Sequence, residues 1–174
     1  MELERNPTWD KVLNELSPLP IKDNLYLATE STLDSYETDS FMTDHPSVLG
    51  TYGMLPLLDG LDKKVMKNTF DKIWDIWHWE DTWGWDFPMT AMTATRLGEP
   101  EKAVDALLMP IVTNTYLKND HNYQSKRLRL YLPGNGGYLI ALAMMAAGTE
   151  ENPKENIGFP KDWNVQHEGL NKMY

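Results

Sequence analysis

The residues best suited to chemistry lie in one short stretch, where Trp83, Gly84, Trp85 and Asp86 follow three earlier tryptophans. Five of the seven tryptophans fall within residues 74–85. Indole faces stack on the apolar faces of sugar rings, and a carboxylate can bind hydroxyls or transfer a proton. The stretch therefore predicts the rim of a carbohydrate-binding cavity, with Asp86 as the candidate catalytic acid or base. Two plainer readings stay open, in which the tryptophans are core residues and Asp86 caps the helix that follows.

Neutral hydrogen-bonding side chains in other segments extend this candidate site. His45 precedes a proline at a predicted helix start, and His121, Asn122 and Gln124 lie together in a polar segment. Asn135 lies in a glycine-rich stretch before an apolar helix. Imidazole and amide groups of this kind bind sugar hydroxyls, so we predict substrate-binding roles for His45, Trp83, Trp85, His121, Asn122, Gln124 and Asn135. For the glycine-rich stretch, a turn that lets two backbones approach is the alternative.

Composition excludes several function classes. With 16 basic and 26 acidic residues the net charge is −10, which disfavours binding to nucleic acid or to anionic membranes. The absence of cysteine excludes disulfides, thiol catalysis and Cys-ligated zinc. No clustered His or acid spacing predicts a metal site, and no phosphate or dinucleotide motif predicts a cofactor. No signal peptide or membrane-spanning run is recognised in the chain, and its localisation is left open.

The elements that must position these residues are helices. Hydrophobic residues make up 41% of the 174, enough for one domain with a real core. We predict a single all-α domain with a helix and exposed linker over residues 1–40, core hairpins over 41–148 and an irregular tail over 149–174. Periodicity, caps, prolines and glycines place the helices near residues 7–16, 46–55, 62–78, 88–97, 100–109 and 138–147. Asn6 is predicted to cap the first of these helices and Gly98 to end the fourth.

The connections carry further expectations. Residues 113–132 are predicted to form a long loop and residues 132–137 a tight turn before the last helix. Gly50 and Gly53 thin one face of their helix and should allow close packing. Helix 62–77 is expected to pair with 85–97, and 100–109 with 138–147. Such pairs are typical of a bundle, a solenoid or an α/α toroid.

Several of these motifs, taken in order, resemble a known family. The order begins with the segment from Asp44 to Pro56 and continues through residues 83–86, 96–98, 121–124 and 134–137. The set is similar to the C-terminal half of six-hairpin, (α/α)6-barrel glycoside hydrolases, over roughly residues 41–148. The inverting alpha-L-fucosidases are the closest likeness, and the maltose and kojibiose phosphorylases a more distant one. The resemblance implies helical hairpins in part of an (α/α)6 toroid and a carbohydrate substrate.

Two departures from that family limit what the resemblance implies. Pro133 stands where the family has its catalytic aspartate, and Asp86 replaces a serine and could supply a displaced carboxylate. The chain also has room for about six helices, whereas the full barrel needs about twelve. We therefore expect a C-terminal part of a larger inverting glycosidase, with little hydrolysis by this chain alone. The missing N-terminal half or a homo-oligomer would complete the cavity. The alternatives are a non-catalytic carbohydrate-binding module and a self-associating structural module.

Overall fold

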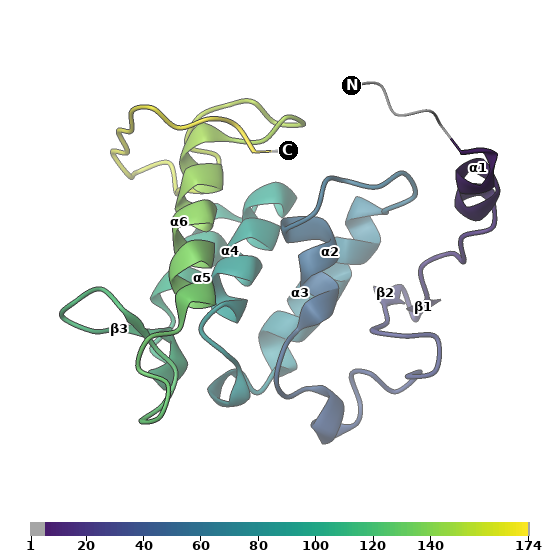
Figure 1. Cartoon of the computed structure of the whole chain (residues 1–174), viewed down its shortest axis with the longest axis horizontal. Coiled ribbons are helices and arrows are strands. Elements are labelled where there is room, and N and C mark those ends of the chain that lie inside the picture. Colours follow the sequence, from purple (N-terminus) through teal and green to yellow (C-terminus); the bar gives the residue numbers. More distant parts are fainter. Residues whose placement is uncertain (1–5, 174) are drawn as a thin grey trace.

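The computed structural model describes residues 6–173, and it is mostly helical, with two small strand pairs (Figure 1). An all-helical core was predicted, and the helices predicted near residues 7–16, 62–78, 88–97 and 100–109 lie close to those positions. The helix predicted over 46–55 is shorter, and the one predicted over 138–147 begins earlier. The α-helices are α1 (Pro7–Asn14), α2 (Gly50–Gly53), α3 (Lys63–Ile76), α4 (Asp86–Leu97), α5 (Pro100–Leu108) and α6 (Leu132–Ala147). The strands are β1 (Ile21–Lys22), β2 (Leu25–Tyr26), β3 (Thr115–Tyr116) and β4 (Asn122–Tyr123), and the 3-10 turns are η1 (Asp39–Phe41), η2 (Ser47–Leu49), η3 (Trp79–Asp81) and η4 (Val112–Asn114).

The core is built around α4, all twelve residues of which are buried. Its apolar and small residues meet α2, α5 and α6. Its threonine hydroxyls are satisfied within the helix, since Thr90 donates to the Asp86 carbonyl at 2.7 Å and Thr95 to the Ala91 carbonyl at 2.8 Å. Gly98, with φ of 84°, ends the helix in the left-handed region, as predicted. A helix buried on every side gives rigid support to the residues at its start.

The close packing predicted from Gly50 and Gly53 is confirmed where α2 meets α4. A Cβ on Gly53 would lie 2.9 Å from the Thr93 nitrogen and 3.0 Å from the Met89 carbonyl oxygen. Any larger residue at this position would therefore push the two backbones apart. Arg96 reaches from α4 to the end of α2 and donates to the Tyr52 and Leu55 carbonyls, at 2.7 and 2.6 Å. A cation suits the negative end of a helix.

Helix α3 begins where its sequence predicts. The Asp62 side chain accepts hydrogen bonds from the Lys64 and Val65 nitrogens, at 2.7 and 3.0 Å, and so caps the first turn. The β1–β2 hairpin lies against this helix, because Thr69 accepts a hydrogen bond from the Tyr26 nitrogen at 2.8 Å. The hairpin is antiparallel, with Ile21 opposite Tyr26.

The predicted turn at residues 132–137 is wrong, because these residues are the first turns of α6. Pro133 is tolerated there, since a first-turn nitrogen has no partner inside the helix. Gly134 and Gly137 serve close packing instead: a Cβ on Gly134 would overlap the Asn122 side chain, and one on Gly137 would lie 2.9 Å from Pro88. The predicted long loop before α6 is also wrong in part, since it contains the antiparallel β3–β4 hairpin.

The pairing predicted for α5 with α6 differs from the structure, in which both helices pack chiefly against α4. Helix α1 begins at the predicted Asn6 cap, which accepts from the Thr8 nitrogen at 2.9 Å. Its apolar stripe is exposed, and α1 lies apart from the other helices in Figure 1. The predicted exposed linker is also partly wrong, because Ser35 is buried within it. No helix within residues 6–173 has the length and apolar character that crossing a membrane requires.

Candidate functional site

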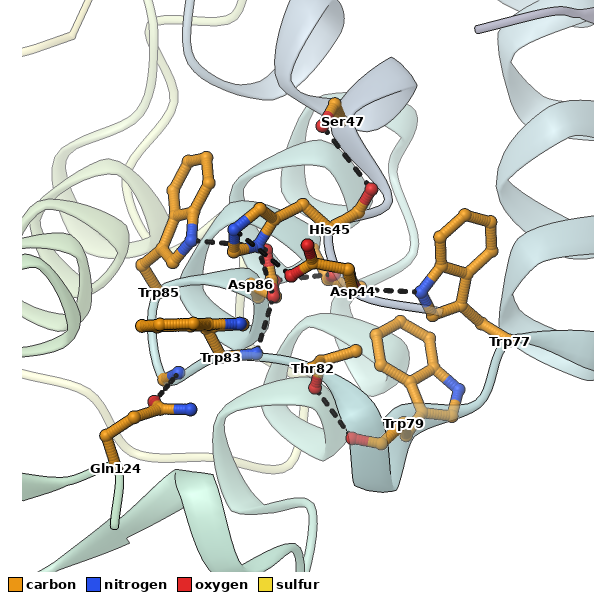
Figure 2. Close-up of polar contacts among 12 residues, drawn as sticks. Asp44, His45, Ser47, Trp77, Trp79, Thr82, Trp83, Trp85, Asp86 and Gln124 are labelled. Atoms are coloured by element: carbon orange, nitrogen blue, oxygen red, sulfur yellow. Dashed lines mark hydrogen bonds and ion pairs between the residues drawn. The ribbon is translucent and has the colours of Figure 1, made fainter. Parts of the chain in front are cut away.

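The centre of the candidate site is a contact between His45 and Asp86, which the sequence placed 41 residues apart (Figure 2). His45 Nδ1 lies 3.1 and 3.0 Å from the two carboxylate oxygens of Asp86. Asp86 is the first residue of α4, and His45 lies in the segment before η2. Asp44, with φ of 60°, shapes this segment, and its carbonyl accepts a hydrogen bond from Trp77 Nε1 at 3.1 Å. The end of α3 therefore fixes His45 over the start of α4.

Asp86 is completely buried, so in this structure it cannot touch a ligand directly. Burial raises the pKa of its carboxyl group to about 6, from an ordinary value of 3.8. The Trp83 nitrogen, which donates to Asp86 Oδ2 at 2.8 Å, and His45 both lower this pKa, but they do not outweigh burial. The carboxyl group does not bond to the free nitrogens of its own helix, unlike the cap that was the alternative reading.

Two groups compete for the same nitrogen of His45. Trp85 Nε1 lies 3.1 Å from His45 Nδ1, and an indole N–H can only donate. Nδ1 has a single site, which holds either a proton or a lone pair. A protonated Nδ1 donates to ionised Asp86, whereas a bare Nδ1 accepts from Trp85 or from the protonated acid. The proton position between His45 and Asp86 is therefore coupled to the Trp85 hydrogen bond.

Aromatic rings surround this pair. The His45 ring lies 4.9 Å from the Trp85 ring and 5.8 Å from the Trp83 ring, measured between centroids. Trp83 is 37% exposed and contacts Tyr131 at a centroid distance of 5.6 Å. Figure 2 shows Trp85 and Trp77 on opposite sides of His45, with Trp83 below it. An exposed indole beside a partly exposed imidazole is a surface that combines stacking with hydrogen bonding.

The side chains of the predicted amide residues form hydrogen bonds with backbone groups next to the site. Gln124 Oε1 accepts from the Gly84 nitrogen at 2.9 Å and so ties the polar segment to the tryptophan turn. Asn122 is fully buried and donates to the Thr113 carbonyl at 3.0 Å, with its own oxygen packed against Gly84 and Gly134. Asn135 Oδ1 accepts from the Asn122 nitrogen at 2.9 Å. In this structure these amides hold backbone, rather than presenting themselves to a ligand.

The structure does not bring all the predicted residues to one cavity. His121 makes its side-chain hydrogen bond to Asn119, at 3.1 Å, and has no recorded contact with the Asp86 group. His45 lines a cavity of about 250 Å³ beside Trp77, whereas Trp85 lines a separate apolar cavity of about 330 Å³ between α4 and α6. The structure therefore brings His45, Trp83, Trp85 and Asp86 into contact with one another and bonds Gln124 to the same turn, but it does not place them around one cavity.

Sequence reasoning missed Tyr131 and the contact of Asp44 with His45. Asp44 Oδ1 lies 3.3 Å from His45 Nε2, and its side chain is 64% exposed. Its local pattern, an acid just before a helix, predicts a cap, but η2 has no side-chain cap. Tyr131 gave no periodic signal, since it lies in the irregular segment before α6.

Neither a metal-binding group nor a known relative identifies a further residue of this site. Within residues 6–173 no three His, Asp or Glu side chains are grouped so that they could hold a metal ion. Comparisons of the chain with protein-family models, curated proteins and solved structures find no match.

Proposed function

We propose that this chain binds carbohydrate on the surface formed by His45, Trp83 and Tyr131, which we name the His45–Trp83 surface. We further propose that it is a glycoside hydrolase-like protein whose helices form part of an (α/α)6 toroid. The observation that carries the binding proposal is the contact of His45 with Trp83 and with Asp86, which lies 41 residues further along the chain. The toroid rests on the ordered motifs that resemble the fucosidase-like enzymes.

The exposure of the groups assigns their roles in this proposal. Trp83 offers the stacking face, and His45, whose side chain is 30% exposed, offers the polar contact. Asp86 acts through His45, since burial keeps it from the ligand. It is therefore a positioning residue that also exchanges a proton with the imidazole. Its raised pKa, near 6, suits proton exchange close to neutral pH.

Binding without hydrolysis is the activity we propose for the chain alone. Inverting glycosidases need two carboxyl groups about 6.5–9.5 Å apart, both reaching the scissile bond or its water. Asp86 cannot reach a substrate here, and the family's aspartate position holds Pro133. A second half of the barrel, or a partner copy, would have to supply the missing carboxyl groups.

Calorimetry with a panel of monosaccharides and oligosaccharides tests this function. The full chain should bind at least one of them, and Trp83→Ala should weaken that binding about tenfold, equal to about 1.4 kcal/mol of stacking energy. Trp9→Ala is the matched control, because Trp9 is a 52% exposed tryptophan on the distant helix α1. Equal effects of the two changes, or no binding by the unaltered chain, would contradict the proposal.

Self-association is a second candidate function, favoured by exposed apolar side chains on two helices. Helix α1 exposes more than half of Trp9, Val12 and Leu13, and α6 exposes Leu139 and Ile140. Apolar surfaces of this kind are typical of protein interfaces. The partner we propose is a second copy of this chain. Sedimentation should then show a dimer that Leu13→Glu weakens, and a monomer at all concentrations would exclude this candidate.

A further inference from the structure

His45 is also one of the residues that line a cavity that the sequence did not suggest. The cavity holds about 250 Å³ between the linker before η1, the η2 segment and Trp77. The linker was expected to be exposed, but two hydrogen bonds hold it in place as one wall of this cavity. Ser35 donates to the Thr32 carbonyl at 2.5 Å, and the Tyr36 hydroxyl donates to the Tyr26 carbonyl. Besides this linker, the residues that line the cavity include Ser40, Phe41, His45, Ser47 and Trp77.

The chemistry of this lining favours a neutral ligand with both apolar and hydroxyl groups. None of the described lining residues is Asp, Glu, Lys or Arg. Aromatic rings come from Tyr36, Phe41 and Trp77, and the polar ends of two of them are occupied. Trp77 Nε1 donates to the Asp44 carbonyl, and the Tyr36 hydroxyl to Tyr26. These rings therefore offer apolar surface. The hydroxyls of Thr32, Ser35 and Ser47 already donate to backbone carbonyls and can offer a ligand only their acceptor side. The Ser40 hydroxyl makes no bond within residues 6–173 and can both donate and accept.

The imidazole of His45 has one nitrogen whose contact a ligand could replace. Its Nδ1 is engaged by Asp86 and Trp85, but its Nε2 meets only the carboxylate of Asp44, at 3.3 Å, among the contacts recorded for the described residues. The Asp44 side chain is 64% exposed, so it can turn into water at little cost. A ligand hydroxyl could then take its place at Nε2.

The size of the cavity limits the ligand to one ring. At about 30 Å³ for each water molecule, 250 Å³ corresponds to about eight waters. Cavities that take drug-sized ligands begin at about 300 Å³. A single sugar ring or a polyol of that size fits this range, and a chain of sugars would have to extend past the mouth, where Phe41 is 43% exposed.

We propose that this cavity is a subsite for one neutral sugar ring, with the linker and Trp77 as its walls and the Ser40 hydroxyl and His45 as its polar groups. This inference rests on the proposed carbohydrate binding and deepens it. A ring in the cavity and a second ring on Trp83 would then both contact His45. Figure 2 shows Trp77, which lines the cavity, on the opposite side of His45 from Trp85.

Calorimetry on the full chain with L-fucose, D-galactose, D-glucose and myo-inositol tests the subsite. Ser40→Leu places a bulky group in the cavity, at an exposed position whose hydroxyl makes no recorded bond within residues 6–173. Monosaccharide affinity should fall at least about tenfold, the equivalent of one or more lost hydrogen bonds. Ser31→Leu, the same change on the same linker outside the cavity, should leave affinity unchanged. If Ser40→Leu does not fold by circular dichroism, Ser47→Val takes its place.

The results separate this inference from the proposed function. Loss of binding in Ser40→Leu, with Ser31→Leu unaffected, supports the subsite. Unchanged monosaccharide binding in Ser40→Leu, together with loss in Trp83→Ala, overturns the subsite and leaves the His45–Trp83 surface standing. Equal losses in Ser40→Leu and Ser31→Leu also overturn it, because the effect would then not come from the cavity. Absence of any binding by the unaltered chain overturns both proposals.

Discussion

Two aspartates in this protein have opposite surroundings, and comparing them shows what kind of site each can form. Asp71 lies on α3 between Lys102 and Lys67, with Nζ–O distances of 2.8 and 2.5 Å. Burial raises its pKa, but hydrogen bonds from the two lysines outweigh burial and lower it. Asp86 has no lysine or arginine among its recorded partners in the described chain, and burial raises its pKa to about 6.

The comparison shows that ionisation has opposite effects in the two clusters: it stabilises the fold at Asp71 and destabilises it at Asp86. The lysines keep Asp71 ionised at neutral pH, and Lys102 also packs over the Phe70 ring at 5.3 Å. That cluster joins α3 to α5 and exchanges no proton near neutral pH. The Asp86 cluster costs stability when it ionises, because burial penalises the charge. A buried acid that shares a proton with a partly exposed histidine is the region better suited to function.

The largest expected effect is on the pH dependence of unfolding. Between pH 4 and 6 the folded protein keeps a proton on Asp86 that the unfolded chain has released, so stability falls as the pH rises. The shift from 3.8 to about 6 corresponds to about 3 kcal/mol above pH 6. In urea unfolding, the stability of Asp86→Asn should no longer fall between pH 4 and 6. The ionisation of Asp71 should instead raise the stability of the unaltered protein as the pH rises through the acid range, and Asp71→Asn should lack this rise.

The two variants should therefore change the pH dependence of stability in opposite directions. If Asp86→Asn kept the fall in stability between pH 4 and 6, the raised pKa would belong to another group. If both variants changed the pH profile in the same direction, the contrast between the two clusters would be wrong.

The next effect concerns the closely packed frame around the Asp86 cluster. A Cβ on Gly84 would overlap the buried Asn122 oxygen, so Gly84→Ala should lower the unfolding free energy by about 1–3 kcal/mol. Gly136 has nothing within 4 Å of its hypothetical Cβ and lies in α6, so Gly136→Ala should stabilise by about 0.5–1 kcal/mol. Thermal or urea unfolding measures both. A neutral Gly84→Ala would show that the site is loosely packed.

A smaller effect concerns the partners of the two carboxyl groups. His45 lowers the pKa of Asp86, so His45→Ala should raise that pKa above about 6. Lys102 lowers the pKa of Asp71, so Lys102→Met should also raise that value, toward the ordinary one. Carboxyl ¹³C NMR titration follows both aspartates in one sample. A fall in the pKa of Asp86 on removal of His45 would contradict the assigned contact.

The smallest effect is the response of the two clusters to salt. The ion pairs of Asp71 are partly exposed, so Lys67→Met should cost about 0.5 kcal/mol at low salt and less at 1 M salt. The Asp86–His45 contact is shielded from solvent on the acid side, so the stability change in Asp86→Asn should vary little with salt. Unfolding at two salt concentrations compares them. Equal salt sensitivity would indicate that water reaches Asp86.

Local signals in the sequence predicted much of the helical framework. The Asn6 cap and the Gly98 stop mark helix ends through short-range hydrogen bonds and backbone conformation, which one segment determines by itself. The start of α6 was missed because its glycines are explained by Asn122 and Pro88, which lie far away in sequence. The same limit hid the β3–β4 hairpin inside a polar segment.

The candidate site was predictable in its residue types and less so in its geometry. The tryptophan turn and Asp86 stood out by composition, and His45 by its place before a helix. The direct contact of His45 with Asp86 depends on how α4 and the segment before η2 pack, which no local pattern encodes. The burial of Asp86, from which we propose a positioning role, likewise comes only from the completed core.

The most direct test of the central claim is an NMR titration of the labelled full chain with L-fucose and then D-galactose. The account predicts that the indole signal of Trp83 and the ring signals of His45 shift together on addition of at least one sugar, while the Trp9 indole does not move. Unchanged His45 and Trp83 signals with both sugars, or shifts confined to Trp9 and α1, would contradict it.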